Sequence, residues 1–142
     1  MLKELAEKAK RIDVKELALQ VAKANEGLIL QRQKQQLTVG EKADGSDIGT
    51  LKSDIYARRK KQRGGSAPFG VPDLKFSGKL YEGLNVNITP AEYNVDSSVS
   101  YSKYNVKRYG KNIYGLQKDN SEDIKFKNSQ DIVGLYKKEL GL

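Results

Sequence analysis

The sequence predicts an α+β protein with a long N-terminal helix, a small antiparallel sheet with extended loops, and a C-terminal helix. Three observations predict this class. Apolar residues recur at three- and four-residue steps over residues 14–28, as on one face of a helix. They alternate with polar residues over residues 84–88, as in a half-buried strand. Four-residue steps return near the end of the chain, over residues 129–140.

The N-terminal helix is expected over residues 14–38. Asp13 suits its N-cap, Glu16 follows three positions later as in a capping box, and Gly40 is the expected stop. The stripe that would face the core consists of Val14, Leu17, Val21, Ala24 and Leu28. Residues 2–11 have good helix propensity and are expected to form a separate preceding turn or two.

The second half of this helix is expected to be more exposed than the first. Gln31 and Gln35 interrupt the apolar stripe there. This half would therefore face solvent, or be buried only by a partner.

A loop-rich arm is predicted over residues 41–73. Its first part is rich in Gly, Asp, Ser and Thr, which indicates tight turns at Asp44-Gly45 and Ile48-Gly49. A short basic helix is expected over residues 55–63, and the Gly- and Pro-rich stretch after it is expected to be extended and mobile.

A small α+β body is predicted over residues 74–142. Its expected elements are a short strand and a Ser77-Gly78 turn, the strand 84–88, one helical turn or a tight turn at 89–92, more strand over 93–101, a short helix closed by Gly110, an apolar return segment, and the closing helix 129–140. Adjacent Glu122 and Asp123 are expected to lie at a helix start, where acidic residues favour the helix dipole. With the helical region 1–40 and the arm, this body completes one domain, 1–142.

The apolar content is low for a protein of 142 residues. Only 37% of the residues are hydrophobic and 31% are charged. Such a chain builds a thin core against the entropy of ordering its backbone. We therefore expect partners to complete its burial.

The residue types exclude most catalytic designs. The chain has no cysteine and no histidine, which removes thiol nucleophiles, imidazole bases and the commonest zinc ligands. A calcium loop starting at Asp44 fails at Ile48 and Ile55, where oxygen ligands are needed. We therefore expect no enzyme, no catalytic residue, no cofactor and no metal site. A carboxylate- or metal-dependent enzyme is a third hypothesis, but no group of residues supports it.

The charge balance points to an acidic partner. The formal net charge is +8, and the longest apolar runs are far short of the roughly 20 residues that cross a bilayer. We expect no membrane contact and no export signal. The sharpest cluster could meet DNA phosphates or an acidic protein surface: Arg58, Arg59, Lys60, Lys61 and Arg63. A weaker cluster with the same two interpretations comprises Lys107, Arg108 and Lys111.

Aromatic and apolar side chains supply the candidate subunit interface. Tyrosine combines a large apolar area with a polar tip, so the eight tyrosines suit either interface anchors or caps of a thin core. The candidate interface residues are Phe69, Val71, Phe76, Tyr101 and Tyr104.

Four short segments resemble one family. They are QQLTVGEKADG (residues 35–45), SDIYARRKK (53–61), PDLKFSGKLYEGLNV (72–86) and YGKNIYGL (109–116). In their order they resemble the tail-completion and head–tail joining (neck ring) proteins of tailed bacteriophages, including those of Bacteroides and crAss-like phages. The long charged N-terminus and the cluster at residues 58–63 depart from that pattern.

The resemblance implies a virion structural protein. It would form a homo-oligomeric ring around the DNA channel with neighbouring portal, neck or tail proteins, with non-specific contact to genomic DNA. Its location would be the neck or tail of the virion, after synthesis in the cytoplasm of a bacterial host. The alternative that the charge supports is a small basic nucleic-acid-binding accessory protein.

Overall fold

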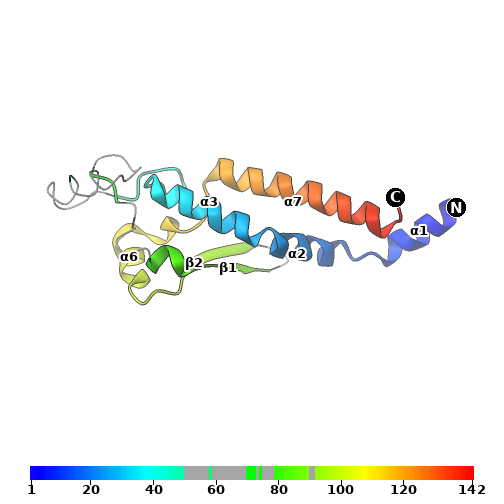
Figure 1. Cartoon of the computed structure of the whole chain (residues 1–142), viewed down its shortest axis with the longest axis horizontal. Helices are drawn as coiled ribbons and strands as arrows, with labels where there is room; N and C mark the ends of the chain where they lie inside the picture. The colour runs from blue at the N-terminus through cyan, green and yellow to red at the C-terminus, as the bar shows by residue number, and fades with distance from the viewer. Residues whose placement is uncertain (50–57, 59–69, 73, 75–78, 90–91) are drawn as a thin grey trace.

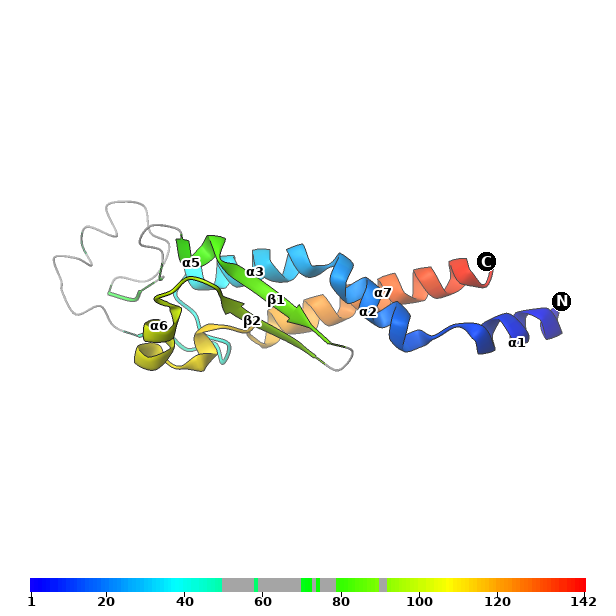
Figure 2. The same cartoon turned by 90° about the horizontal axis from the view of Figure 1, so that it is seen from below.

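The computed structural model describes residues 1–49, 58, 70–72, 74, 79–89 and 92–142. This part of the chain confirms the α+β class, with helices at both ends and a two-stranded antiparallel sheet. The elements form three layers in an elongated molecule, with α7 (Lys118–Glu139) on one side, α2 (Val14–Ala24) and α3 (Glu26–Thr38) in the middle, and the sheet on the other side (Figure 1). Figure 2 shows α1 (Leu2–Arg11) projecting at the end where both termini lie.

The predicted N-terminal helix is present but is interrupted at Asn25. Asp13 caps α2 as expected, because its Oδ1 accepts from the main-chain N–H groups of Lys15 at 3.0 Å and Glu16 at 3.3 Å. Asn25 leaves helical geometry, with φ −95° and ψ 10°. Its side-chain amide donates to α7 instead, to Asn128 Oδ1 at 2.7 Å and Asp131 Oδ2 at 3.0 Å. This tertiary contact divides the helix into α2 and α3.

The prediction of an exposed second half was wrong. Four residues of α3 are buried within the chain itself: Ile29, Gln33, Gln36 and Leu37. α3 lies between α7 and the sheet, so it has neighbours on two sides (Figure 1). In the predicted stripe of α2, by contrast, Leu17 and Val21 are buried but Val14 is 54% exposed.

The sheet pairs β1 (Leu84–Ile88) with β2 (Tyr93–Ser97), with Leu84 opposite Ser97 and Ile88 opposite Tyr93. The alternation that predicted β1 corresponds to inward Leu84, Val86 and Ile88 and outward asparagines. Thr89 N–H donates to Glu92 O at 2.8 Å between the two strands, whereas residues 90 and 91 of the predicted turn lie outside the described residues. The second strand ends at Ser97 and does not continue to residue 101.

The remaining short elements fit the prediction unevenly. The helix α5 (Lys79–Glu82) was not predicted, and the expected Ser77-Gly78 turn lies outside the described residues. The short helix α6 (Ser102–Tyr109) ends, as expected, at Gly110 with φ +100°, a value that favours glycine. The 3₁₀ turn η1 (Lys111–Ile113) follows it. The turn at Asp44-Gly45 is present, but Ile48, assigned to a turn, is 1% exposed and belongs to the core.

The C-terminal helix α7 begins at Lys118 and not at residue 129. Its N-cap is Gln117, whose side chain accepts from the main-chain N–H of Asp119 at 3.0 Å. Glu122 and Asp123 therefore do not cap the helix, and instead lie within it. Apolar residues are sparse in its first half, so sequence periodicity did not reveal it.

The core is small and lies where α3, α5, η1 and α7 meet. The side chains of Ile29, Leu37, Ile48, Leu80, Ile113 and Ile124 are each at most 1% exposed. Half-buried tyrosines and valines surround them. In the described ranges, none of the helices has the length and apolar character that a membrane span requires.

Candidate assembly surface

Two buried glutamines join the middle layer to the segment that leads into α7. Gln33 Oε1 accepts from Gly115 N–H at 2.7 Å, and its Nε2 donates to Ile113 O at 3.4 Å. Gln36 Nε2 donates to Gly115 O at 2.8 Å, and its Oε1 accepts from Gln117 N–H at 2.8 Å. We call these four bonds the glutamine ladder. They satisfy main-chain groups that would be costly to bury unpaired.

Gly115 allows the ladder to form. Its φ of +109° turns the main chain so that its N–H and C=O meet different glutamines, and L side chains rarely adopt this value. A Cβ on Gly115 would also lie 3.3 Å from Ala43 Cβ. The ladder therefore fixes where α7 starts relative to α3, and hence which face of α7 meets the body.

The inner face of α7 is polar as well as apolar. Ile124, Asn128, Asp131 and Leu135 follow three- and four-residue steps and face α2 and α3. Asn25 and Lys127 both donate to the Asp131 carboxylate, and they hold its pKa below the usual 3.8. Ile124 is the one residue that the fully described α7 buries.

The opposite face of α7 carries a second row, which we call the outer seam: Phe126, Ser129, Val133, Tyr136 and Leu140. Its steps of three and four residues match the spacing by which helices pack against helices. Phe126 is 66% exposed and Val133 is 52% exposed. Phe126 and Val133 are therefore largely uncovered by the other described residues, whereas Tyr136 and Leu140 are half-buried. A long helix with an apolar row on each side suits contact with a second surface.

The helix α1 is the second uncovered apolar feature. Leu2, Leu5, Ala9 and Ile12 form a stripe along it, yet α1, described in full, has no buried residue. Leu2 is 83% exposed. A helix of 10 residues is marginal in water without packing. The stripe of α1 is therefore also a candidate contact surface.

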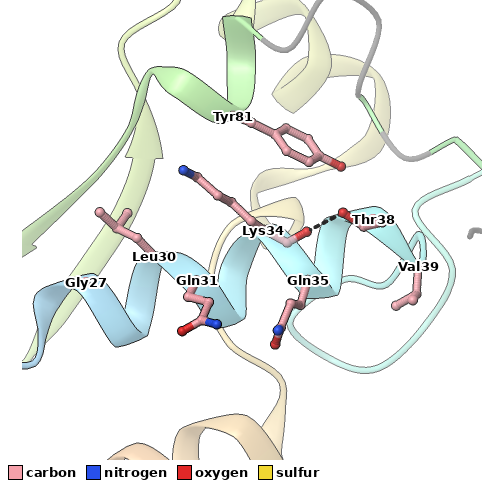
Figure 3. A pocket seen from close by; sticks show the side chains of 8 residues that line it. All are labelled: Gly27, Leu30, Gln31, Lys34, Gln35, Thr38, Val39 and Tyr81. Atoms are coloured by element: carbon pink, nitrogen blue, oxygen red, sulfur yellow. Dashed lines mark hydrogen bonds between the residues drawn. The ribbon is translucent and has the colours of Figure 1, made fainter. Parts of the chain in front are cut away.

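A groove of about 680 Å³ runs along the solvent side of α3, as Figure 3 shows. Leu30, Lys34 and Thr38 form one wall, and Tyr81 of α5 lies across from them. Burial raises the pKa of Tyr81 to about 12. Of the lining residues that the structure describes, Lys34 is the only charged one.

No family model, curated protein or solved structure matches the chain. The resemblance to phage neck and tail-completion proteins thus stays a prediction. The described residues contain no group of acidic side chains arranged to hold a metal ion.

The structure places only part of the predicted cation cluster. Arg58 is exposed, whereas Arg59, Lys60, Lys61 and Arg63 lie outside the described residues. The weaker cluster is complete: Lys107, Arg108 and Lys111 are all exposed at one end of the body. Arg108 also lies over the Tyr109 ring, with 5.1 Å from its Cζ to the ring centroid.

The predicted interface residues do not form one surface. Tyr104 is 64% exposed, and the Lys103 ammonium lies 5.2 Å from its ring centroid. Tyr101 is half-buried and packs against the core, and Val71 is also half-buried. Phe69 and Phe76 lie outside the described residues.

Sequence reasoning missed the outer seam and the ladder. The three- and four-residue steps from Phe126 to Leu140 were a usable signal for the seam, had the helix been extended towards the N-terminus. The ladder had no such signal, because Gln33 and Gln36 read as ordinary polar residues.

Proposed function

We propose that this chain is a structural subunit that works by assembling with copies of itself and with neighbouring proteins. The outer seam of α7 carries this proposal. This helix of 22 residues buries only Ile124 within the described chain and leaves Phe126 66% and Val133 52% exposed. The stripe of α1 adds a second such surface.

More specifically, we propose a ring-forming head–tail connector or tail-completion subunit of a tailed bacteriophage. The order of four short segments and the α+β class support this assignment. A small body anchored by the ladder would form the ring wall, while α1 and α7 reach adjacent subunits. Such a protein needs no catalytic group and no cofactor.

The direct test is the mass and shape of the purified protein. Light scattering after size-exclusion chromatography should give a multiple of the 15.9 kDa subunit mass, and electron microscopy should show closed rings. A portal or tail protein from the same virion should retain the subunit in a pull-down. A protein that stays monomeric at high concentration, and binds no such component, would refute the proposal.

A second candidate function is binding to nucleic acid. It is favoured by the exposed cations of α6 and η1, where Arg108 and Lys103 lie over tyrosine rings. Replacing Lys107, Arg108 and Lys111 by alanine should lower duplex DNA affinity and flatten its salt dependence. Replacing Lys137 and Lys138, at the far end of α7, is the control. No binding by the unaltered protein at low salt would exclude this function.

A further inference from the structure

We propose that the apolar stripe of α1 from one copy of this chain docks on the outer seam of α7 in the next copy. The proposal rests on the assembly function above and names the surfaces that would perform it. In this contact Leu2 and Leu5 of α1 would cover the exposed Phe126 at the start of the outer seam.

Reach excludes the same arrangement within one chain. Asn25 lies opposite Asn128, so the start of α2, about 18 Å away along the axis, is level with the C-terminal end of α7. Lys8 accordingly lines a pocket with Glu139 at that end. If α1 folded back along α7, it would span about 15 Å from the junction between α1 and α2. Phe126 lies about 22 Å from that junction, so α1 would not reach it. The first half of α7 therefore lies beyond the reach of α1 of the same chain, and α1 of another copy can reach it.

Charge favours the first half of α7 as the docking position. Lys8 and Lys10 lie on either side of the α1 stripe. Asp119 and Glu122 continue the spacing of the outer seam towards the N-terminus of α7, and both are exposed. Glu122 has an ion pair with Lys118, but its 4.0 Å separation and high exposure make it weak. Its carboxylate can therefore pair with a lysine of α1.

Charge disfavours the groove on α3. Among the described residues that line that groove, Lys34 is the only charged one. Lysines beside the α1 stripe would repel it. The start of α7 offers the opposite charges of Asp119 and Glu122, although Lys118 and Lys125 lie beside them, whereas the described lining of the groove offers like charge alone.

The helices fit best in antiparallel orientation. The last turn of α1 carries Lys8, Lys10 and Arg11. Set against Asp119 and Glu122, these cations would place Leu2 and Leu5 along Phe126 and Ser129. The small Ala6 and Ala9 of α1 allow the two helix axes to approach closely. The contact is head-to-tail, so repetition gives a ring if the rotation closes.

Cysteine cross-linking tests the contact cleanly, because the chain has no cysteine of its own. A tagged full-length chain with Leu2→Cys and an untagged chain with Ser129→Cys are mixed and oxidised. Both positions are exposed. We expect a disulfide-linked heterodimer, and none when Ser129→Cys is replaced by Gln31→Cys in the groove of α3.

Three outcomes would overturn the inference. A strong Ser129→Cys homodimer would indicate that two α7 helices pair with each other, and a cross-link to Gln31→Cys would place α1 in the groove. An oligomer that shows no cross-link would reject α1 docking while leaving the assembly function intact. If the unaltered protein is monomeric and also binds no portal or tail protein, the assembly function itself fails.

A charge exchange gives an independent measurement. Lys8→Glu with Lys10→Glu should weaken association, by at most about fivefold per pair as for exposed ion pairs. Adding Asp119→Lys and Glu122→Lys should restore it. Failure of the second pair to rescue the first would show that these charges do not meet.

Discussion

Gln33 and Gln36 fix α3 on the segment that precedes α7, because each pairs with main-chain groups of residues 113–117. A buried side-chain amide supplies both a donor and an acceptor. It can therefore pair with main-chain N–H and C=O groups as a neighbouring strand would. The cost of losing such a group is dominated by the main-chain partners left unpaired. Each glutamine of the ladder should therefore contribute more to the free energy of unfolding than the size of its side chain suggests.

Replacing Gln36 by leucine should lower the free energy of unfolding by about 1–3 kcal/mol, since Gln117 N–H and Gly115 O lose their partner. Urea unfolding followed by circular dichroism measures this. Gln35→Leu, one residue earlier and exposed, is the matched control and should change stability by no more than about 0.5 kcal/mol. Equal effects of the two changes would contradict a role for the ladder.

The titration of Asp131 should make the stability of the folded protein depend on pH. Its pKa in the folded protein lies below 3.8 because Asn25 and Lys127 donate to the ionised form. Its contribution to stability is therefore complete above the unfolded pKa and disappears as pH falls through the folded value. Melting temperatures of the unaltered protein and of Asp131→Asn should differ at pH 6 and converge below about pH 3.8.

The control for this titration is Gln130→Asn, which changes a neighbouring exposed side chain without adding or removing a charge. Its melting profile should run parallel to that of the unaltered protein. A constant gap between Asp131→Asn and the unaltered protein across the acid range would contradict the assignment.

Elements with dense apolar periodicity were predictable, and those held by tertiary contacts were not. The spacing of Leu17 and Val21 and the alternation of Leu84 and Val86 locate α2 and β1 from local sequence alone. The break at Asn25 depends on bonds to residues about a hundred positions later. α3 looked exposed because its buried partners are main-chain groups. No local pattern reports such contacts.

At the level of the helix, Gly134 offers a stabilising change. It lies within α7, and a Cβ added there would meet nothing within 4 Å. Gly134→Ala should therefore raise the free energy of unfolding by roughly 0.4–1 kcal/mol, because alanine loses less entropy in a helix. Gly115→Ala is the opposing control and should destabilise, since φ there is +109°. A destabilising Gly134→Ala would show that a close neighbour requires the glycine.

The molecule as a whole places a small core at one end and two under-covered helices, α1 and α7, towards the other (Figures 1 and 2). A partner that binds only the folded form raises the stability of that form by mass action. The low apolar content of the sequence pointed to partners in general. The position of the outer seam required the structure, because it depends on which face of α7 the ladder turns inwards.

If the outer seam is an interface, the melting temperature should rise with protein concentration. Phe126→Asp should abolish that rise while leaving the melting temperature of the dilute protein nearly unchanged, because Phe126 is 66% exposed. Differential scanning fluorimetry over a hundredfold concentration range measures both effects. Lys125→Asp, which changes charge beside the seam without removing apolar area, is the control. A concentration dependence that survives Phe126→Asp would place the interface elsewhere.

The glutamine ladder also sets an order of events during synthesis. Gln33 and Gln36 leave the ribosome long before Gly115 and Gln117, the main-chain groups that they pair with. Until those groups appear, the middle layer has neither its polar partners nor α7 beside it. α3 must therefore wait, incompletely packed, until residues 113–117 have been synthesised.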